Sequence, residues 1–320
     1  MKFLLPLRVL RKKEKIFLFF LNWVEKTKGK FMTLHARPMY ASGIESNSKI
    51  IGSYPKTAIV MQGPILKAND FTLETVRIYK KLHPKVLIIV STWNDEDPAY
   101  LDKIRQENAE IVLSEKPRVT APARFFNINF QIASTIAGIK RAEALGTEYV
   151  LKTRNDQRMY SPGLFEYLHN LLEYFPPENS QRIFMKKRLA ALGARSGGSK
   201  LYYLSDELLF GNIEDMVRYW QINLVKKDTE NFSSVEGYLF STFLKNIGRD
   251  ILWTIEDSHE AYAKYCVIID PLYADLYFHK YERHMEYRTP RYKHIRHQPL
   301  FFLDWLKIYN NYKNRQTPVA

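Results

Sequence analysis

The sequence predicts an α/β protein built on a mostly parallel sheet with helices on both faces. Three observations support this fold class. Short apolar runs alternate with helical segments across residues 57–160, which implies parallel strands joined by right-handed crossovers. Polar residues follow several of these runs, where an open α/β sheet binds its ligands. Finally, 320 residues with 46% hydrophobic side chains can bury one large core.

The expected elements of the first half follow one another closely. Residues 57–62 are an apolar strand that ends in Gly63-Pro64, a turn signal. A helix is expected from Thr72 to Leu82, because apolar residues recur there at helical spacing and Thr72 can cap the first turn. The same criteria predict strands at residues 86–90, 110–113 and 149–153, and helices at residues 99–108 and 128–145.

The second half is expected to build the acceptor side of the same domain. Residues 201–204 and 267–269 have strand character, and residues 238–247 have helical spacing behind a capping pair, Ser233-Ser234. The single cysteine, Cys266, excludes an internal disulfide framework. No Gly-x-Gly-x-x-Gly follows the first strand, so a Rossmann dinucleotide site is not expected.

The net charge of +14 is concentrated at the two ends of the chain. Residues 1–30 carry +7 and residues 279–320 carry +6, which leaves +1 for the residues between them. A nucleic-acid enzyme usually carries its basic surface on the working domain. We therefore expect no nucleic-acid partner and instead expect an anionic membrane surface as a partner.

The amino-terminal segment is expected to lie on a membrane without crossing it. The longest uninterrupted apolar run within Met1–Val24 is six residues, whereas a spanning helix needs about 20. Large apolar groups, a Trp and clustered Lys/Arg suit a helix in the interface, although packing on the parent domain or a partner is an alternative. The expected division is a membrane-associating segment and linker at 1–50, a catalytic domain at 51–278, and a basic aromatic segment at 279–320 that also associates with the membrane.

Two consecutive segments follow a familiar plan. Asn127–Ala142 is a helix with polar residues at its start, and Gly146–Asp156 leads through an apolar strand into Arg154-Asn155-Asp156. This plan resembles nucleotide-sugar glycosyltransferases of the GT-A type, in which the strand ends in Asp-x-Asp. Only the last carboxylate of that motif is kept here.

A narrower resemblance covers residues 58 to about 240. The chain is similar to the WavE lipopolysaccharide synthesis family on the segments Ile59–Ile65, Ser91–Trp93, Asn127–Gln131 with Ser134-Thr135, Leu151–Asp156, Ser205-Asp206 with Phe210-Gly211, and Glu236–Leu239. The resemblance implies a bacterial envelope-glycan enzyme. Together with the basic ends of the chain, it leads us to expect a peripheral protein at the cytoplasmic face of the inner membrane. The enzyme would move a sugar from a nucleotide-sugar donor to a lipid-linked lipopolysaccharide, lipooligosaccharide or capsule acceptor. The alternative is a non-catalytic module that binds nucleotide sugars or glycans and tethers an assembly complex.

The resemblance also implies how a donor diphosphate would be bound. Asp156 would hold a divalent cation, Mn²⁺ or Mg²⁺, because these ions prefer oxygen ligands and substrate phosphates. His279 is a second candidate ligand, with a structural role as its alternative. Lys152 and Arg154 share one face of their strand and could contact the phosphates. In an alternative mechanism these two cations do part of the metal's work.

The remaining candidates would bind the donor or move a proton. The resemblance assigns donor contacts to the residues that follow the strands and begin the long helix: Gln62, Gly63, Thr92, Asn94, Arg124, Asn127, Asn129 and Gln131. For Asn127, helix capping is an equal alternative. An inverting transferase needs a carboxylate to take the proton of the acceptor hydroxyl, and a retaining mechanism is the alternative. Glu236 is the first candidate and Asp206 the second, and Glu236 could instead complement the dipole of its helix.

Overall fold

The computed structural model divides the chain into two compact units, Met1–Pro38 and Met39–Ala320. The first unit contains helix α1 (Leu7–Lys28). Among the described residues, no helix combines the length and apolar character that crossing a bilayer requires. The structure describes residues 7–29, 36–45, 53–118, 121–122, 125, 127–180, 182–195, 200–226, 234–281 and 300–316.

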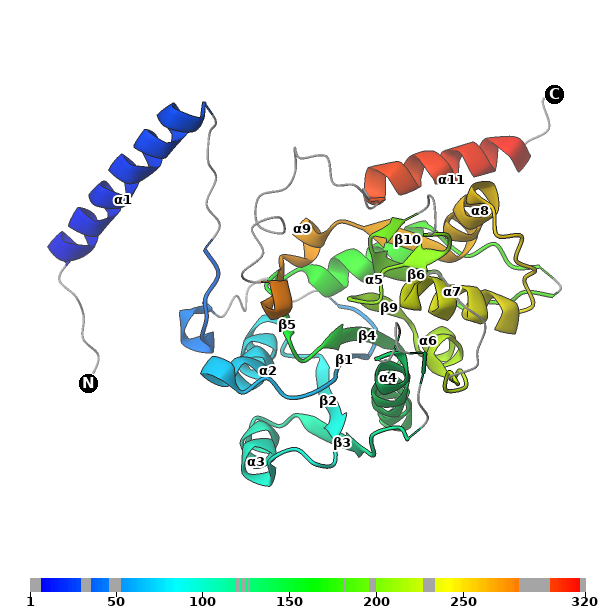
Figure 1. The fold of residues 1–320 in the computed structure, drawn as a ribbon, viewed down its shortest axis with the longest axis horizontal. Coiled ribbons are helices and arrows are strands. Elements are labelled where there is room, and N and C mark those ends of the chain that lie inside the picture. Colours follow the sequence, from blue (N-terminus) through cyan, green and yellow to red (C-terminus); the bar gives the residue numbers. More distant parts are fainter. Residues whose placement is uncertain are drawn as a thin grey trace. The chain divides into compact units, whose positions relative to one another are not determined.

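A seven-stranded sheet forms the centre of the second unit (Figure 1). Its strand order is β10-β6-β9-β4-β1-β2-β3, and every neighbouring pair is parallel except the two that involve β9. The strands are β1 (Thr57–Gln62), β2 (Leu87–Trp93), β3 (Glu110–Ser114), β4 (Tyr149–Arg154), β6 (Leu189–Leu192), β9 (Leu209–Asn212) and β10 (Cys266–Ile269). Two smaller sheets pair β5 (Gln157–Met159) with β11 (Leu276–Phe278) and β7 (Ala194–Arg195) with β8 (Tyr203–Leu204).

Helices cover both faces of the sheet. The crossovers through α2 (Phe71–Leu82) and α3 (Pro98–Gln106) move from β1 towards β3, whereas the crossover through α4 (Ile128–Ala144) returns to β4. Right-handed connections in opposite directions place their helices on opposite faces. The helices that follow are α5 (Leu164–Tyr174), α6 (Ile213–Trp220), α7 (Val235–Asn246), α8 (Ile255–Tyr265), α9 (Pro271–Ala274) and α11 (Phe302–Gln316).

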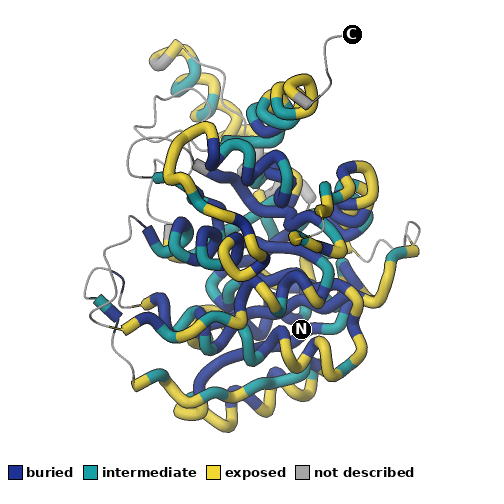
Figure 2. Tube along the Cα trace, turned by 90° about the vertical axis from the view of Figure 1, so that its right-hand side faces the viewer, coloured by how far each residue is buried: buried dark blue, intermediate teal, exposed yellow. Residues whose placement is uncertain are grey.

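Contacts assign the later helices to these layers. α5 lies on the α2 face, because Phe165 packs edge-on against His83 at the end of α2, with ring centroids 4.9 Å apart. α6 packs on α4, and α7 packs on α6. Figure 2 shows that the buried residues concentrate along the central strands and the inner sides of these helices.

The predicted fold class is confirmed, including the mostly parallel sheet and the four strands expected from residue 57 to residue 154. The segment at 201–204 is a strand only at Tyr203–Leu204. Residues 39–45, where a linker is expected, contain a short 3₁₀ helix, Ala41–Gly43. This helix is held on α2, because the N–H of Ala41 donates to Glu74 Oε2 at 2.7 Å.

Arg158 fixes this amino-terminal edge of the second unit. Its guanidinium is buried, stacks on the ring of Phe71 and donates to Thr75 Oγ1 and to the carbonyl oxygens of Met39 and Phe71. A buried cation of this kind is stable only when its donors are satisfied. Arg158 is therefore committed to the fold.

Close approach of α4 to the sheet depends on Gly138. A Cβ atom at this position would lie 2.5 Å from Val60 Cγ1 and 3.0 Å from Ser91 Cβ. We expect Gly138→Ala to lower the free energy of unfolding by roughly 1–3 kcal/mol, because overpacking moves α4 off β1 and β2. Urea denaturation measures this change.

A double-mutant cycle tests the cause. Val60→Ala opens space for the new methyl group, so the cost of Gly138→Ala is expected to fall in the Val60→Ala background. Gly163→Ala is the matched control, because nothing lies within 4 Å of its added Cβ and its φ is −94°. Strict additivity of the two core substitutions would contradict the proposed contact.

Candidate active site

One edge of the sheet gathers the polar residues. The carboxyl ends of β1, β2 and β4 meet there, with Gln62 paired to Ser91 on one side and to Arg154 on the other. Because β9 is antiparallel, its beginning lies at the same edge, where Leu209 pairs with Lys152. Glu207 precedes β9 by two residues and lies close enough to Arg154 for the Arg154 charge to lower its pKa. This edge is the usual ligand side of an open α/β sheet.

Arg154 and Asp156 form a two-point ion pair at this edge. Arg154 donates from Nε to Asp156 Oδ1 at 2.8 Å and from Nη2 to Oδ2 at 2.9 Å. The two side chains are 31% and 25% exposed. Burial opposes the charge on Arg154, but the hydrogen bonds to Asp156 and its charge outweigh burial and raise the Arg154 pKa. Arg154 is therefore fully charged at neutral pH.

Lys152 stabilises this edge of the sheet from the protein interior. Its ammonium is buried, donates to the main-chain oxygen of Asp206 and lies 3.7 Å from Asp206 Oδ2. It also faces the ring of Trp220 at 5.1 Å. Burial lowers the pKa of Lys152 to about 8, while the Asp206 carboxylate opposes that shift. Lys152 thus holds the segment before β9 in place, and its donors are turned away from solvent.

Three carboxylates converge at the start of β9 and of α7. Asp206 is tied to Lys152, and Glu236 accepts a hydrogen bond from Tyr203 Oη at 2.9 Å. Burial and then the charge of Asp206 raise the pKa of Glu236. Glu236 lies in the first turn of α7, where Ser234 Oγ accepts the N–H of Gly237 as the helix cap.

Glu207 is the carboxylate of this cluster whose side chain forms no hydrogen bond or ion pair among the described residues. Burial and then the charge of Asp206 raise its pKa to about 7, although Arg154 and Lys152 lower it. Tyr219 lies beside the cluster, and its buried hydroxyl has no hydrogen-bond partner within the described part of the chain. The cluster thus contains one carboxylate that changes protonation state near neutral pH.

The first turns of α4 bring further polar atoms to the carboxyl end of β1. Ser134 donates from Oγ to Gln62 Oε1 at 3.0 Å. One turn of helix separates Gln131 Nε2 and Thr135 Oγ1, which are buried and have no partner among the described residues. Buried polar atoms are rarely left unpaired, and those that remain at a ligand-binding edge are candidates for substrate contact.

Four further residues with predicted donor contacts either bond to other protein groups or have exposed side chains. Asn129 donates from Nδ2 to the carbonyl oxygen of Val225 at 2.8 Å, and its Oδ1 accepts the N–H of Val225 at 2.7 Å. Thr92 donates to Glu96 at 3.2 Å. Asn94 and Asn127 are exposed, and the Asn127 side chain makes no cap hydrogen bond to α4.

Gly63 shapes the turn after β1. Its φ is +104°, a backbone conformation that L side chains rarely adopt, and its N–H donates to the carbonyl oxygen of Ser91 at 3.1 Å. Its carbonyl oxygen accepts from Asn155 Nδ2. Arg124 lies outside the described residues, as does the basic stretch at 282–299. The predicted donor contacts stay predictions.

The residues around Asp156 do not form a preassembled cation site. Arg154 occupies both carboxylate oxygens of Asp156, and the ring of His279 packs on Phe71 with centroids 5.4 Å apart. No group of three His, Cys, Asp or Glu residues within the described ranges could hold a metal ion. Arg154 would therefore compete with a cation for the Asp156 carboxylate. The predicted metal site at Asp156 and His279 stays a prediction.

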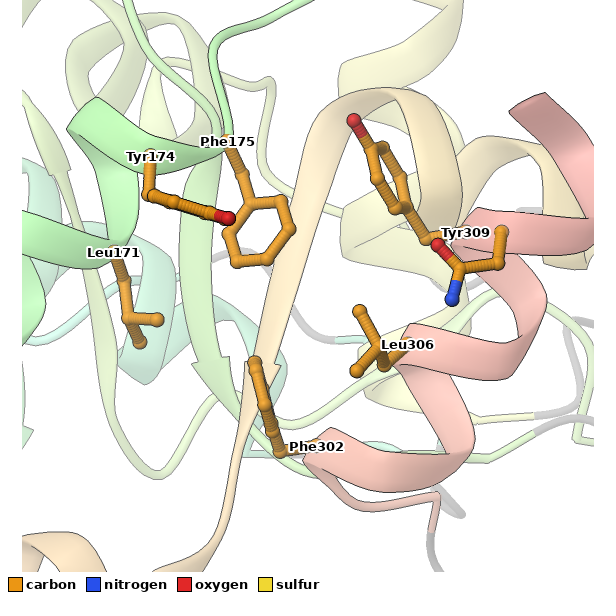
Figure 3. Close-up of a pocket in the computed structure, with 7 residues that line it drawn as sticks. Leu171, Tyr174, Phe175, Phe302, Leu306 and Tyr309 are labelled. Carbon is orange, nitrogen blue, oxygen red and sulfur yellow. The ribbon is translucent and has the colours of Figure 1, made fainter.

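A separate apolar cavity of about 660 Å³ lies between α5 and α11 (Figure 3). None of the predicted site residues lines it, and the side chains that do are mostly aromatic or aliphatic: Leu171, Tyr174, Phe175, Phe302, Leu306, Tyr309 and Asn310. The lining therefore contains no carboxylate or imidazole group.

The sequence pattern did not indicate Glu207, Tyr219 or the pairing of Arg154 with Asp156. Glu207 follows Asp206 directly, and that acidic pair before an apolar run was the available signal. Which of two adjacent acids faces a neighbour depends on where β9 inserts. That insertion is set by contacts between segments far apart in the chain.

The fold is that of an α/β protein whose charged side chains gather at the edge where open sheets usually bind ligands. The chain belongs to the WavE lipopolysaccharide synthesis family, which it matches over residues 57–246, as the sequence resemblance predicted. A search of curated proteins found no match.

Solved structures give likenesses at low identity. A 4-diphosphocytidyl-2C-methyl-D-erythritol synthase from Anaerococcus prevotii is 12% identical over 67% of this chain and 87% of its own, with a TM-score of 0.38. A glycosyltransferase of major-capsid glycosylation in PBCV-1 is 16% identical over 68% and 83%, with a TM-score of 0.33. A Pyrobaculum calidifontis mannosyltransferase in complex with GDP-Man and Mn²⁺ is 10% identical over 72% and 59%, with a TM-score of 0.34. Because these TM-scores are below 0.5, the family match alone carries the assignment.

The raised pKa of Glu207 predicts a pH-dependent stability difference. Folding favours the protonated form of Glu207. The stabilisation that this form gives the folded state is fully present below the unfolded pKa of 4.5 and is lost as pH rises through about 7. We expect Glu207→Gln to raise the free energy of unfolding by about 1 kcal/mol at pH 8.5 and by less at pH 5. Thermal unfolding at both pH values measures this.

The control is Glu214→Gln, whose side chain is 49% exposed on α6. It should change stability equally little at both pH values. A pH dependence shared by both variants would contradict a raised pKa at Glu207.

Proposed function

We propose that this protein is a glycosyltransferase that moves a sugar from a nucleotide-sugar donor to a lipid-linked lipopolysaccharide intermediate. Membership of the WavE family supports the envelope-glycan role. The observation that carries the chemistry is the convergence of Arg154 with Glu207, an otherwise unengaged carboxylate, at the ligand edge of the sheet. Sugar transfer from a nucleotide donor needs a group that binds phosphate and a group that accepts a proton.

The reaction requires one proton transfer in which Glu207 acts as the base. The acceptor hydroxyl oxygen bonds to the anomeric carbon, and the bond from that carbon to the diphosphate oxygen breaks. The electron pair leaves with the diphosphate, and the hydroxyl proton passes to Glu207. A carboxyl with a pKa of about 7 is well matched to this task, since catalysis is best when the base titrates near the working pH.

Glu207 is preferred to the two carboxylates that the sequence suggested. Asp206 is held by Lys152, and Glu236 is hydrogen-bonded to Tyr203. In this arrangement Asp206 raises the basicity of Glu207 by its charge. Asp206 and Glu236 are therefore positioning residues in the proposed mechanism.

The donor's nucleoside is proposed to lie along β1 and the first turns of α4. Gln131 Nε2 and Thr135 Oγ1 offer buried, unpartnered polar atoms there, beside the Gln62–Ser134 contact. Backbone N–H groups at the start of α4 also favour a phosphate group nearby.

Replacement of the proposed base should remove turnover and spare binding. We expect Glu207→Gln to lower kcat by about 10²- to 10⁴-fold, with little change in nucleotide affinity. Wild-type kcat should rise with pH through about 7, because the base acts when deprotonated. Release of nucleoside diphosphate from a panel of nucleotide sugars, with a lipooligosaccharide acceptor, measures both.

Glu214→Gln is the matched control and should retain activity. Full activity of Glu207→Gln together with loss of activity in Glu236→Gln would move the base to Glu236. A wild-type protein that binds a nucleotide sugar yet turns over none of the panel, and whose Asp206, Glu207 and Glu236 variants leave envelope glycan unchanged, would favour the non-catalytic tethering module.

Peripheral attachment to the cytoplasmic face of the inner membrane is part of this proposal. Ile16, Phe19, Phe20 and Trp23 recur at helical spacing on α1, and each side chain is at least half exposed. An amphipathic basic helix of this type binds an anionic interface through apolar burial and charge attraction.

We expect the full chain to co-sediment with vesicles containing anionic lipid and less with zwitterionic vesicles. Phe19→Ser combined with Trp23→Ser should reduce this binding at least several-fold, and added salt should weaken it further. Leu252→Ser, which alters an exposed apolar residue of the second unit, is the control. Equal binding by both variants would contradict attachment through α1.

A further inference from the structure

Arg154 is held in a fixed orientation by Asp156 and by a second segment of the chain. The guanidinium faces the ring of Phe278 at 5.2 Å, and the main-chain oxygen of Asp156 accepts the N–H of His279 at 3.0 Å. β5 continues directly from this turn and pairs with β11, where Gln157 lies opposite Phe278. Two segments distant in the chain therefore hold Arg154 at the sheet edge.

The orientation of Arg154 leaves donors available. A guanidinium has five N–H groups, and Asp156 uses one on Nε and one on Nη2. No other hydrogen bond engages Arg154 among the described residues, so three N–H groups remain. These groups form the planar fork that suits phosphate oxygens.

No other cation of β4 or β5 is available for that task. Lys152 is fully buried and bound to Asp206, and Arg158 is satisfied by backbone oxygens and Thr75. Of these three cations, Arg154 is the one that is both fixed by an ion pair and partly exposed, at 31%. It pairs with Gln62 in register, and its charge acts on Glu207.

We propose that Arg154 binds the diphosphate of the donor directly, with no divalent cation at Asp156, and that Asp156 is a positioning residue for Arg154. This inference rests on the proposed function and specifies its ligand chemistry, a nucleoside diphosphate. Charge that develops on the leaving diphosphate is then neutralised by the guanidinium. In this arrangement Asp156 orients Arg154 and does not act as a metal ligand.

Calorimetric binding of UDP, GDP, CDP and ADP to the full chain tests the inference, in buffer with EDTA and in buffer with Mn²⁺. We expect one of these to bind with affinities that agree within about twofold in the two buffers. Arg154→Ala should weaken binding at least tenfold in both buffers, and Arg154→Lys should restore only part of it. Asp156→Ala should weaken binding several-fold and equally in both buffers.

Two controls keep the result specific. Arg105→Ala removes an arginine that pairs with Asp102 on the exposed side of α3, and it should leave binding unchanged. Thermal unfolding identifies any variant that fails to fold, and Arg154→Lys keeps the charge if Arg154→Ala is unstable.

The outcomes separate this inference from the proposed function. Binding that requires Mn²⁺ and loses its metal dependence in Asp156→Ala would overturn the inference and leave the glycosyltransferase proposal standing. Unchanged affinity in Arg154→Ala would do the same. Failure of all four nucleotides to bind in either buffer would contradict both.

Discussion

Burial of the Lys152 ammonium is the constraint on which the candidate site depends. A buried charge is tolerated only when a partner and hydrogen bonds compensate for its lost hydration. Here Asp206 supplies both a carboxylate and a main-chain oxygen from the segment before β9. The antiparallel strand β9 is thereby fixed next to β4, and the acidic segment is brought to the edge where the parallel strands end.

The charges at this edge divide into distinct tasks. One ion pair, Lys152 with Asp206, is buried and structural, and the other, Arg154 with Asp156, is partly exposed and leaves donors unused. Glu207 is left between them, where burial and the neighbouring acid favour its protonated form. Perturbed carboxylates of this kind cluster at functional sites, because the fold tolerates their unfavourable burial in exchange for reactivity.

Several residues that suit a ligand site by type are used by the fold. Arg158 binds α2 and the segment near Met39, and Asn129 pins the backbone of Val225. His279 contributes its N–H to the turn at Asp156 and its ring to the packing on Phe71. Residue type and spacing alone do not separate these roles, since the same amide or guanidinium can satisfy backbone groups or a substrate.

The sequence by itself determined the α/β class, the four parallel strands from β1 to β4 and the edge at which polar residues gather. Periodicity and turn residues are local properties, so they are legible along the chain. Family membership followed from motifs spread over residues 57–246. Only the tertiary structure decided that β9 inserts antiparallel, that Glu207 faces this edge and that Arg154 occupies the carboxylate of Asp156. These outcomes depend on which distant side chains compensate buried charge, and no local pattern encodes that choice.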